Sequence, residues 1–293
     1  MSRSYPLLAA RVFNTPLLVH PAKGRVIAQA LAGRMGLGQI AMAGEALEPM
    51  AGDWFDDDDS DSAPRRIDPG YDVHHGMAVI NIEGTLVHRT RAARTSCGML
   101  GYNAVRNALA GALADDTVRA IVLVCNSPGG EVSGCFDLVD AIFAARGIKP
   151  IAAICDDMAF SACYAIASAC DVITVPRTGG VGSVGVVTMH ADFSKALHDD
   201  GVDVTIFTHG DRKAAGNPYN QLTREDRAQI QAEIDELGDL FINTVARNRG
   251  MSPADIVAMQ ARCYMGASGV DAGLADAVMA PDEAFRSLLA ELG

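Results

Sequence analysis

Ser161 stands where a serine could act as a nucleophile, because it follows an expected strand and the loop of residues 156–160 and opens a run of small residues. Residues 161–170 are expected to form a buried helix, so the hydroxyl of Ser161 would lie beside the positive end of the helix dipole. The backbone N–H of Ala162 would then be free to donate to a developing oxyanion. This arrangement suits attack on a carbonyl group. The simpler alternative is that Ser161 only caps the helix, since serine is a preferred capping residue.

A pair of glycines could complete such a site. They belong to residues 126–130, with the sequence Asn-Ser-Pro-Gly-Gly, which we expect to leave a strand and enter a helix. Adjacent glycines let the backbone come close to a ligand and direct N–H groups towards it. Gly129 and Gly130 therefore form a candidate oxyanion hole.

A serine nucleophile needs a base, and the sequence offers histidine or lysine. None of the seven histidines lies in a motif, so a Ser-His-Asp arrangement stays open but has no positive support. Lys213 stands in a glycine-punctuated loop. A free lysine has a pKa of about 10.4, so a basic role requires the site to lower that pKa by roughly 3 units, about 4 kcal/mol, chiefly through burial. By composition alone, a loop lysine is more simply a solvated surface group.

Other chemistries lack their motifs. The sequence contains no nucleotide-binding P-loop, no H-E-x-x-H, no C-x-x-C and no G-x-S-x-G. The glycines of residues 180–185 fit G-x-G-x-x-G, but residues 184–189 are expected to form a strand where a dinucleotide site needs a helix. The acidic residues 53–61 lack the glycine and glutamate of a calcium loop. We therefore expect neither a metal site nor a cofactor.

Strand-like and helical segments alternate after Gly70, which predicts an α/β fold. The expected strands are 77–82, 120–124, 150–154, 172–175 and 184–189. The expected helices are 102–113, 132–145 and 161–170. Residues 156–160 are expected to form a loop. Thr223 and Asp226 form a capping box ahead of a long helix that Arg249 and Gly250 should end.

Composition indicates a globular protein that does not bind nucleic acid. The chain of 293 residues is 49% hydrophobic and 20% charged, long enough to bury a sizeable core. Its net charge of −12 would repel a phosphate backbone. An odd number of cysteines without C-x-x-C is typical of the reducing cytosol. Since no apolar stretch reaches the length of a membrane span, we expect a soluble cytoplasmic protein with no membrane partner.

Four motifs that occur in order resemble peptidase family S49, the signal-peptide-peptidase-A-like serine peptidases with the ClpP/crotonase fold. They are N-S-P-G-G at 126–130, D-M-A-F-S-A-C-Y at 157–164, G-G-V-G-S-V-G-V at 179–186 and the lysine loop at 210–216. The separation of Ser161 and Lys213 along the chain also matches that of single-domain members. The resemblance covers about residues 75–280.

The resemblance implies an α/β fold of the ClpP/crotonase type, with repeated β-β-α units and a C-terminal helical region. Residues 66–293 would form this peptidase domain, and residues 1–65 an N-terminal arm with the acidic linker. The resemblance assigns Ser161 as the nucleophile and Lys213 as the general base. It assigns the N–H groups of Gly130 and Ala162 as the oxyanion donors. Ser183 and Gly129 would be supporting residues, and the Ser183 hydroxyl would orient the lysine. Family members commonly have Asp where this chain has Asn126, and we expect little effect because that side chain is not a donor.

Residues 13–18, 84–87 and 216–219 resemble the head-maturation proteases of lambda-like tailed phages within this family. This implies an endopeptidase that processes capsid, scaffold or portal proteins in the host cytoplasm or the phage prohead, and that could cut its own N-terminal arm. Family members form rings whose subunits can share active sites, so we expect a homo-oligomer. The alternatives are a cytosolic enzyme that degrades short hydrophobic peptides, and a non-catalytic scaffold or acyl-CoA-binding module on the same fold.

Overall fold

The structure is a computed structural model that describes residues 15–20, 23, 26, 40–42, 45–47, 68–95 and 97–293. Contacts divide the chain into two units. The described part of the larger unit comprises residues 18–20, 23, 68–95, 97–185 and 241–293, and that of the smaller unit comprises residues 15–17, 26, 40–42, 45–47 and 186–240. The expected domain boundary at residue 65 and the acidic stretch at 53–61 lie outside the described residues, so the expected domain division stays a prediction.

A mixed sheet with a parallel centre runs through the larger unit, following the path β13-β12-β10-β8-β5-β4, with β11 on β10 and β14 on β11. Its strands are β4 (Asp72–His74), β5 (Met77–Glu83), β8 (Ala120–Ser127), β10 (Ile151–Phe160), β11 (Val172–Val175), β12 (Gly180–Gly182), β13 (Cys263–Met265) and β14 (Ala277–Val278). The central strands β5, β8 and β10 are parallel and largely buried, as strands covered on both faces should be. The α/β prediction is confirmed in this form.

The strand that carries Ser161 at its end is β10. Its first half pairs with β11 and its second half with β12, while β8 flanks its other side. The prediction of a loop at 156–160 is wrong, although the pairing with β8 is irregular between Cys155 and Ala159 and leaves Asp156 and Asp157 exposed. The strand continues to Phe160 because β12 supplies it with a new partner.

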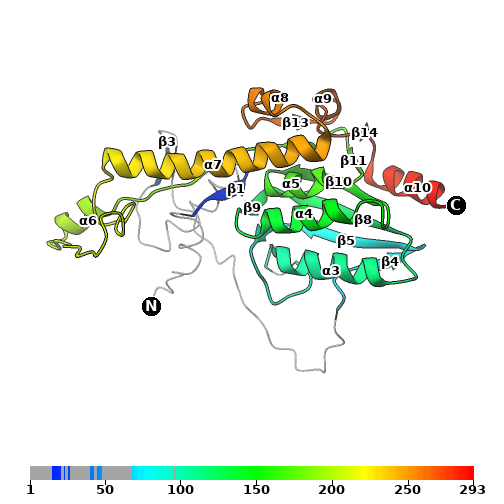
Figure 1. Ribbon diagram of the computed structural model, residues 1–293, viewed down its shortest axis with the longest axis horizontal. Coiled ribbons are helices and arrows are strands. Elements are labelled where there is room, and N and C mark those ends of the chain that lie inside the picture. Colours follow the sequence, from blue (N-terminus) through cyan, green and yellow to red (C-terminus); the bar gives the residue numbers. More distant parts are fainter. Residues whose placement is uncertain are drawn as a thin grey trace. The chain divides into compact units, whose positions relative to one another are not determined.

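Helices α3 (Tyr102–Ala114), α4 (Cys135–Ala145) and α5 (Ala162–Ser168) lie side by side on the sheet (Figure 1). All residues of α5 are buried, and its small side chains allow close packing. Helix α4 begins three residues later than predicted, after Gly134 at φ 82°. Helix α10 (Pro281–Leu292) packs its apolar residues on Met77, Val122 and Ile154, which belong to three neighbouring strands.

A second sheet has the order β1-β9-β6-β7. Its strands are β1 (Leu17–Val19), β9 (Gly129–Glu131), β6 (Thr85–Val87) and β7 (Met99–Gly101). Strand β6 is parallel to both β7 and β9. In this order, β9 lies between β6 and β1.

The long helix α7 (Arg224–Arg249) begins at the predicted capping box. The Asp226 N–H donates to Thr223 Oγ1 at 3.0 Å, and the Thr223 N–H donates to Asp226 Oδ2 at 3.2 Å. The helix ends at Arg249, as predicted, where Gly250 has φ 65°. Beyond it follow the short helices α8 (Pro253–Ala258) and α9 (Ala267–Asp271).

The smaller unit contains the antiparallel pair β2 (Ile40–Met42) and β3 (Glu45–Leu47), helix α6 (Ser194–Asp199) and the first part of α7. The prediction of a strand at 184–189 is wrong, since only Val187 makes an isolated antiparallel bridge, to Leu17. Gly182 and Ser183 have φ 107° and 57°, so the chain turns out of the sheet directly after β12.

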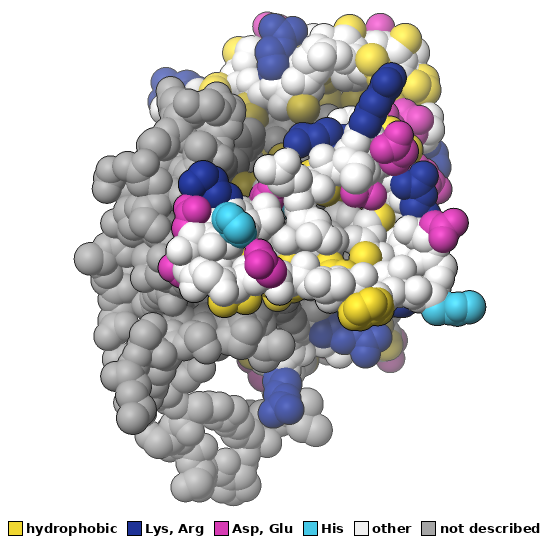
Figure 2. Space-filling model, turned by 90° about the vertical axis from the view of Figure 1, so that its left-hand side faces the viewer, with side chains coloured by type: hydrophobic (Ala, Val, Ile, Leu, Met, Phe, Trp, Pro, Cys, Tyr) yellow, Lys and Arg dark blue, Asp and Glu magenta, His cyan; other side chains and the backbone are white. Residues whose placement is uncertain are grey.

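Charged groups of both signs are interspersed over the described part of the face in Figure 2. Among the helices formed by described residues, none is long and apolar enough to cross a membrane. The described side chains also include no group of three or more His, Cys, Asp or Glu that could hold a metal ion. All seven cysteines are free thiols, and five of them are buried.

Candidate active site

Ser161 lies at the junction between β10 and α5 in a strained conformation. Its φ and ψ angles are 55° and −117°, a backbone region that residues other than glycine rarely adopt. Ser161 is only 1% exposed, and its Oγ has no hydrogen-bond partner among the residues that the structure describes. Because most buried hydroxyls find a partner, an orphaned one at a strained position indicates a functional group.

The serine does not cap helix α5, so the simpler interpretation of Ser161 is wrong. Its Oγ makes no capping hydrogen bond. The backbone instead fixes the residue, because its N–H donates to the Gly182 carbonyl at 2.8 Å and its own carbonyl accepts the Ala165 N–H at 2.9 Å. The first N–H groups of the helix have no acceptor within it, as at any helix start, and one of them belongs to Ala162.

The glycine pair lies against this serine, but it forms strand β9 rather than entering a helix directly, so that part of the prediction is wrong. Gly129 has φ 101°. A Cβ placed on it would lie 3.0 Å from the Ala162 nitrogen and 3.0 Å from Ser161 Cβ, and would overlap the Leu18 carbonyl oxygen. A Cβ on Gly130 would overlap the Leu86 carbonyl. The absence of a side chain at Gly129 therefore allows the Leu18 carbonyl oxygen to lie beside Ser161 and the Ala162 nitrogen.

A residue that sequence reasoning did not assign, Ser127, holds this glycine segment. Its hydroxyl donates to the Gly84 carbonyl at 2.6 Å and accepts the Gly129 N–H at 3.1 Å. Ser127 is fully buried. The local signal was available, because a serine two residues before a glycine can form a side-chain turn with its N–H. The contact with Gly84, 43 residues away, carries no such local signal.

Ser183 occupies the equivalent position at the end of the neighbouring strand β12. Phe160 and Gly182 are paired across β10 and β12, so Ser161 and Ser183 both follow paired residues. Ser183 is buried at φ 57°, and its N–H donates to the Arg262 carbonyl at 3.0 Å. Burial raises the pKa of the Cys263 thiol, and a hydrogen bond with the Ser183 side chain opposes that rise. The structure thus groups Ser161, Ala162, Gly129 and Ser183.

Lys213 belongs to the smaller unit, whereas these residues belong to the larger one. It lies in a turn, where its N–H donates to the Gly210 carbonyl at 3.1 Å, and its side chain is exposed. Its role as the base of Ser161 therefore stays a prediction.

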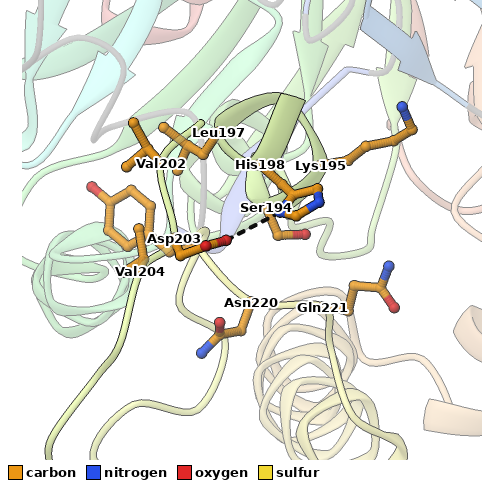
Figure 3. A pocket seen from close by; sticks show the side chains of 10 residues that line it. Ser194, Lys195, Leu197, His198, Val202, Asp203, Val204, Asn220 and Gln221 are labelled. Carbon is orange, nitrogen blue, oxygen red and sulfur yellow. Dashed lines mark hydrogen bonds and ion pairs between the residues drawn. The ribbon is translucent and has the colours of Figure 1, made fainter. Parts of the chain in front are cut away.

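A histidine–carboxylate pair occurs elsewhere in the smaller unit. It lines a pocket of about 440 Å³, where the His198 ring is directed towards Asp203 with Nδ1 and Oδ1 3.1 Å apart (Figure 3). Ser194 lines the same pocket, but its hydroxyl donates to Asp192 at 2.6 Å. Because His198 and Asp203 are exposed and the serine is engaged elsewhere, this group does not form a catalytic relay.

Comparison with known proteins identifies the family. The model of peptidase family S49 matches residues 144–293, which include Ser161, Ser183 and Lys213. The chain belongs to peptidase family S49. It is 37% identical to the capsid assembly protease C of Escherichia phage lambda over 288 residues, and 35% identical to the head-tail preconnector protein GP5 of Enterobacteria phage P21 over 296 residues. These alignments cover 97% and 100% of this chain but only 65% and 58% of the relatives.

A more distant relative is Protease 4 of Haemophilus influenzae, 27% identical over 223 residues, or 74% of this chain and 35% of that protein. The two phage proteins thus match nearly the whole chain, including regions that the alignment with Protease 4 leaves out.

Proposed function

We propose that the chain is a serine endopeptidase with Ser161 as its nucleophile. The observation that carries the proposal is the buried Oγ of a strained Ser161, which has no hydrogen-bond partner among the described residues and lies beside Gly129 and Ala162. An unsatisfied buried hydroxyl costs about 1–3 kcal/mol, and such a cost is found where a group must stay available for reaction.

In the proposed reaction, neutral Lys213 takes the proton of Ser161 as Oγ attacks a peptide carbonyl carbon. The N–H groups of Gly130 and Ala162 stabilise the negative charge that develops on the carbonyl oxygen. The ammonium of Lys213 then protonates the leaving amine, the C–N bond breaks, and an acyl-enzyme forms. Water, deprotonated by the lysine, hydrolyses the ester and regenerates the serine. Ser183 orients the lysine amine.

A homo-oligomeric enzyme would provide a way to bury Lys213, which is exposed in its turn of the smaller unit. A lysine base must lose much of its hydration before its pKa approaches neutrality. We propose that assembly of subunits buries Lys213 against a Ser161 of the same or a neighbouring chain. We also propose the ClpP/crotonase type of fold for the larger unit, supported by the recurrence of strands followed by helices in β8–β9–α4 and β10–α5.

The substrates we propose are capsid, scaffold or portal proteins of a tailed phage or prophage, cut in the host cytoplasm or within the prohead. The support is the similarity to two phage proteins over nearly the whole chain, one of which is named a capsid assembly protease.

The test is a time course by intact mass spectrometry with capsid and scaffold proteins, and separately with short hydrophobic peptides. Wild type should cut the capsid or scaffold protein, and Ser161→Ala and Lys213→Ala should not. Lys195→Ala is the matched control, since Lys195 is also an exposed lysine of the smaller unit and should leave cleavage unchanged. Equal cleavage by all variants would refute the dyad, and cleavage of the short peptides alone would refute the proposed substrates.

Mixing the two inactive variants tests the sharing of sites between subunits. If Ser161 and Lys213 act across an interface, mixed oligomers of Ser161→Ala and Lys213→Ala contain some intact sites and should recover part of the activity. Light scattering on the same samples should show an oligomer; a fully active monomer would contradict the proposed assembly.

A further inference from the structure

Strand β1 runs along β9, the strand that carries the site's glycines. A peptide substrate usually binds a protease-like groove as an added strand, because main-chain hydrogen bonds along a sheet edge align it. With β6 on its other side, β9 has one edge for such a strand, and β1 takes it.

The carbonyl oxygen of Leu18 lies against Gly129, beside Ser161 and Ala162. A Cβ on Gly129 would overlap the Leu18 oxygen, and the same Cβ would lie 3.0 Å from both the Ala162 nitrogen and Ser161 Cβ. The Leu18 oxygen therefore borders the space between the nucleophile and the N–H that would stabilise an oxyanion.

Neighbouring residues anchor this segment on both sides of the site. The His20 N–H donates to the carbonyl of Pro128, the residue before Gly129, at 2.7 Å. The His20 ring stacks on Phe160, the residue before Ser161, with ring centroids 5.0 Å apart. Leu18 is fully buried and Val19 nearly so.

Ser161 is buried beside this segment. A nucleophile that is 1% exposed cannot receive a peptide unless a covering segment moves away. Of the three atoms nearest to a Cβ built on Gly129, one belongs to β1, the carbonyl oxygen of Leu18, and the other two belong to Ser161 and Ala162.

From these contacts we infer that the groove along β9 binds an extended apolar peptide and that Leu18–His20 is its internal occupant, which keeps the site closed until it leaves. This inference rests on the proposed peptidase function. The expected ligand is an extended peptide with two buried aliphatic residues followed by a residue whose ring stacks on Phe160.

Peptide binding tests the inference without catalysis. The probe is a fluorescent peptide of residues 15–23, and the protein carries Ser161→Ala. In this background, Leu18→Glu places a charge in a fully buried position and should release the segment. If the segment fills the groove nine-tenths of the time or more, its release should raise the apparent affinity for the probe about tenfold or more. The matched control is Val73→Glu, because Val73 is a half-exposed residue of β4.

A gentler variant covers the case in which Leu18→Glu does not fold. His20→Ala removes the stacking on Phe160 from a half-buried residue and should give a smaller gain in affinity with an unchanged melting temperature. Equal affinity for the probe in Ser161→Ala, His20→Ala and Val73→Glu backgrounds would overturn the inference, as would equal binding of a scrambled probe.

A second readout separates this inference from the proposed function. With Ser161 intact, Leu18→Glu or His20→Ala should hydrolyse a short peptide faster than wild type. If no form hydrolyses any peptide but the probe binds as expected, the peptidase proposal fails and the occupied groove stands. If wild type cuts its substrate but the released variants neither bind the probe nor gain activity, the inference fails alone.

Discussion

Replacing Gly129 by alanine should destabilise the protein and inactivate it, for two separable reasons. Gly129 has φ 101°, where a residue with a Cβ costs about 1–2 kcal/mol more than glycine. Its Cβ would also overlap the Leu18 oxygen and approach Ser161 Cβ and the Ala162 nitrogen at 3.0 Å. Forcing a methyl group into a packed site costs about 1–3 kcal/mol more.

Gly147 provides a matched control for the free-energy cost of placing alanine at a positive φ angle. It has φ 83°, and a Cβ added there would meet no atom within 4 Å. Gly147→Ala should therefore cost about 1–2 kcal/mol from the backbone alone. The difference between the two variants, about 1–3 kcal/mol, then measures the overlap at Gly129.

Activity should separate the variants further. The methyl group of Gly129→Ala would lie close to both Ser161 and the Ala162 N–H. The carbonyl oxygen of a bound substrate could then not reach that donor. Losing one oxyanion donor lowers the rate on the order of 100-fold. Urea denaturation gives the stabilities and peptide hydrolysis the rates. If Gly129→Ala matched Gly147→Ala in both measurements, the open space at Gly129 would have no role in the site.

Three further predictions concern the serine, an ion pair and a helix cap. Ser161→Ala should abolish hydrolysis yet raise the free energy of unfolding by about 1 kcal/mol in urea, because it removes a buried hydroxyl without a partner. Burial tends to raise the pKa of Asp276, but hydrogen bonds from Arg249 and the Ile173 N–H outweigh this effect and lower that pKa. The ionised carboxylate of Asp276 therefore stabilises the fold above about pH 4, and this stabilisation is lost as the pH falls through the lowered pKa. Asp276→Asn should thus cost about 1–3 kcal/mol at pH 7 and flatten the acid side of a stability–pH curve. Thr223→Ala should cost about 1 kcal/mol and speed hydrogen exchange at the Asp226 amide, whose N–H it leaves uncapped.

The sequence predicts those parts of the site that depend on local chemistry. A serine before a run of small residues and a glycine pair after a strand are local patterns, and the structure brings Gly129, Ser161 and Ala162 together. The capping box at Thr223 is local in the same way. Ser127, Leu18 and His20 were missed because each acts through a partner far along the chain, as when Ser127 binds Gly84.

The two strand errors have one physical cause, since a strand depends on a partner as much as on its own residues. Asp156 and Asp157 suggested a loop, yet β12 pairs with the end of β10 and keeps it extended. The β-branched residues 184–189 suggested a strand, yet positive φ angles at Gly182 and Ser183 turn them away from the sheet.

The strain at Ser161 is maintained by backbone bonds that leave the residue little alternative. Its N–H is held by Gly182, and the next residue along β12, Ser183, is held by Arg262. Both serines have positive φ angles, 55° and 57°, directly after two adjacent strands. Because these bonds lie wholly within the larger unit, Ser161 should keep its backbone geometry when Lys213 in the smaller unit is replaced. Lys213→Ala should therefore slow the reaction by removing a base while leaving the stability of the larger unit unchanged, whereas Gly129→Ala should change both.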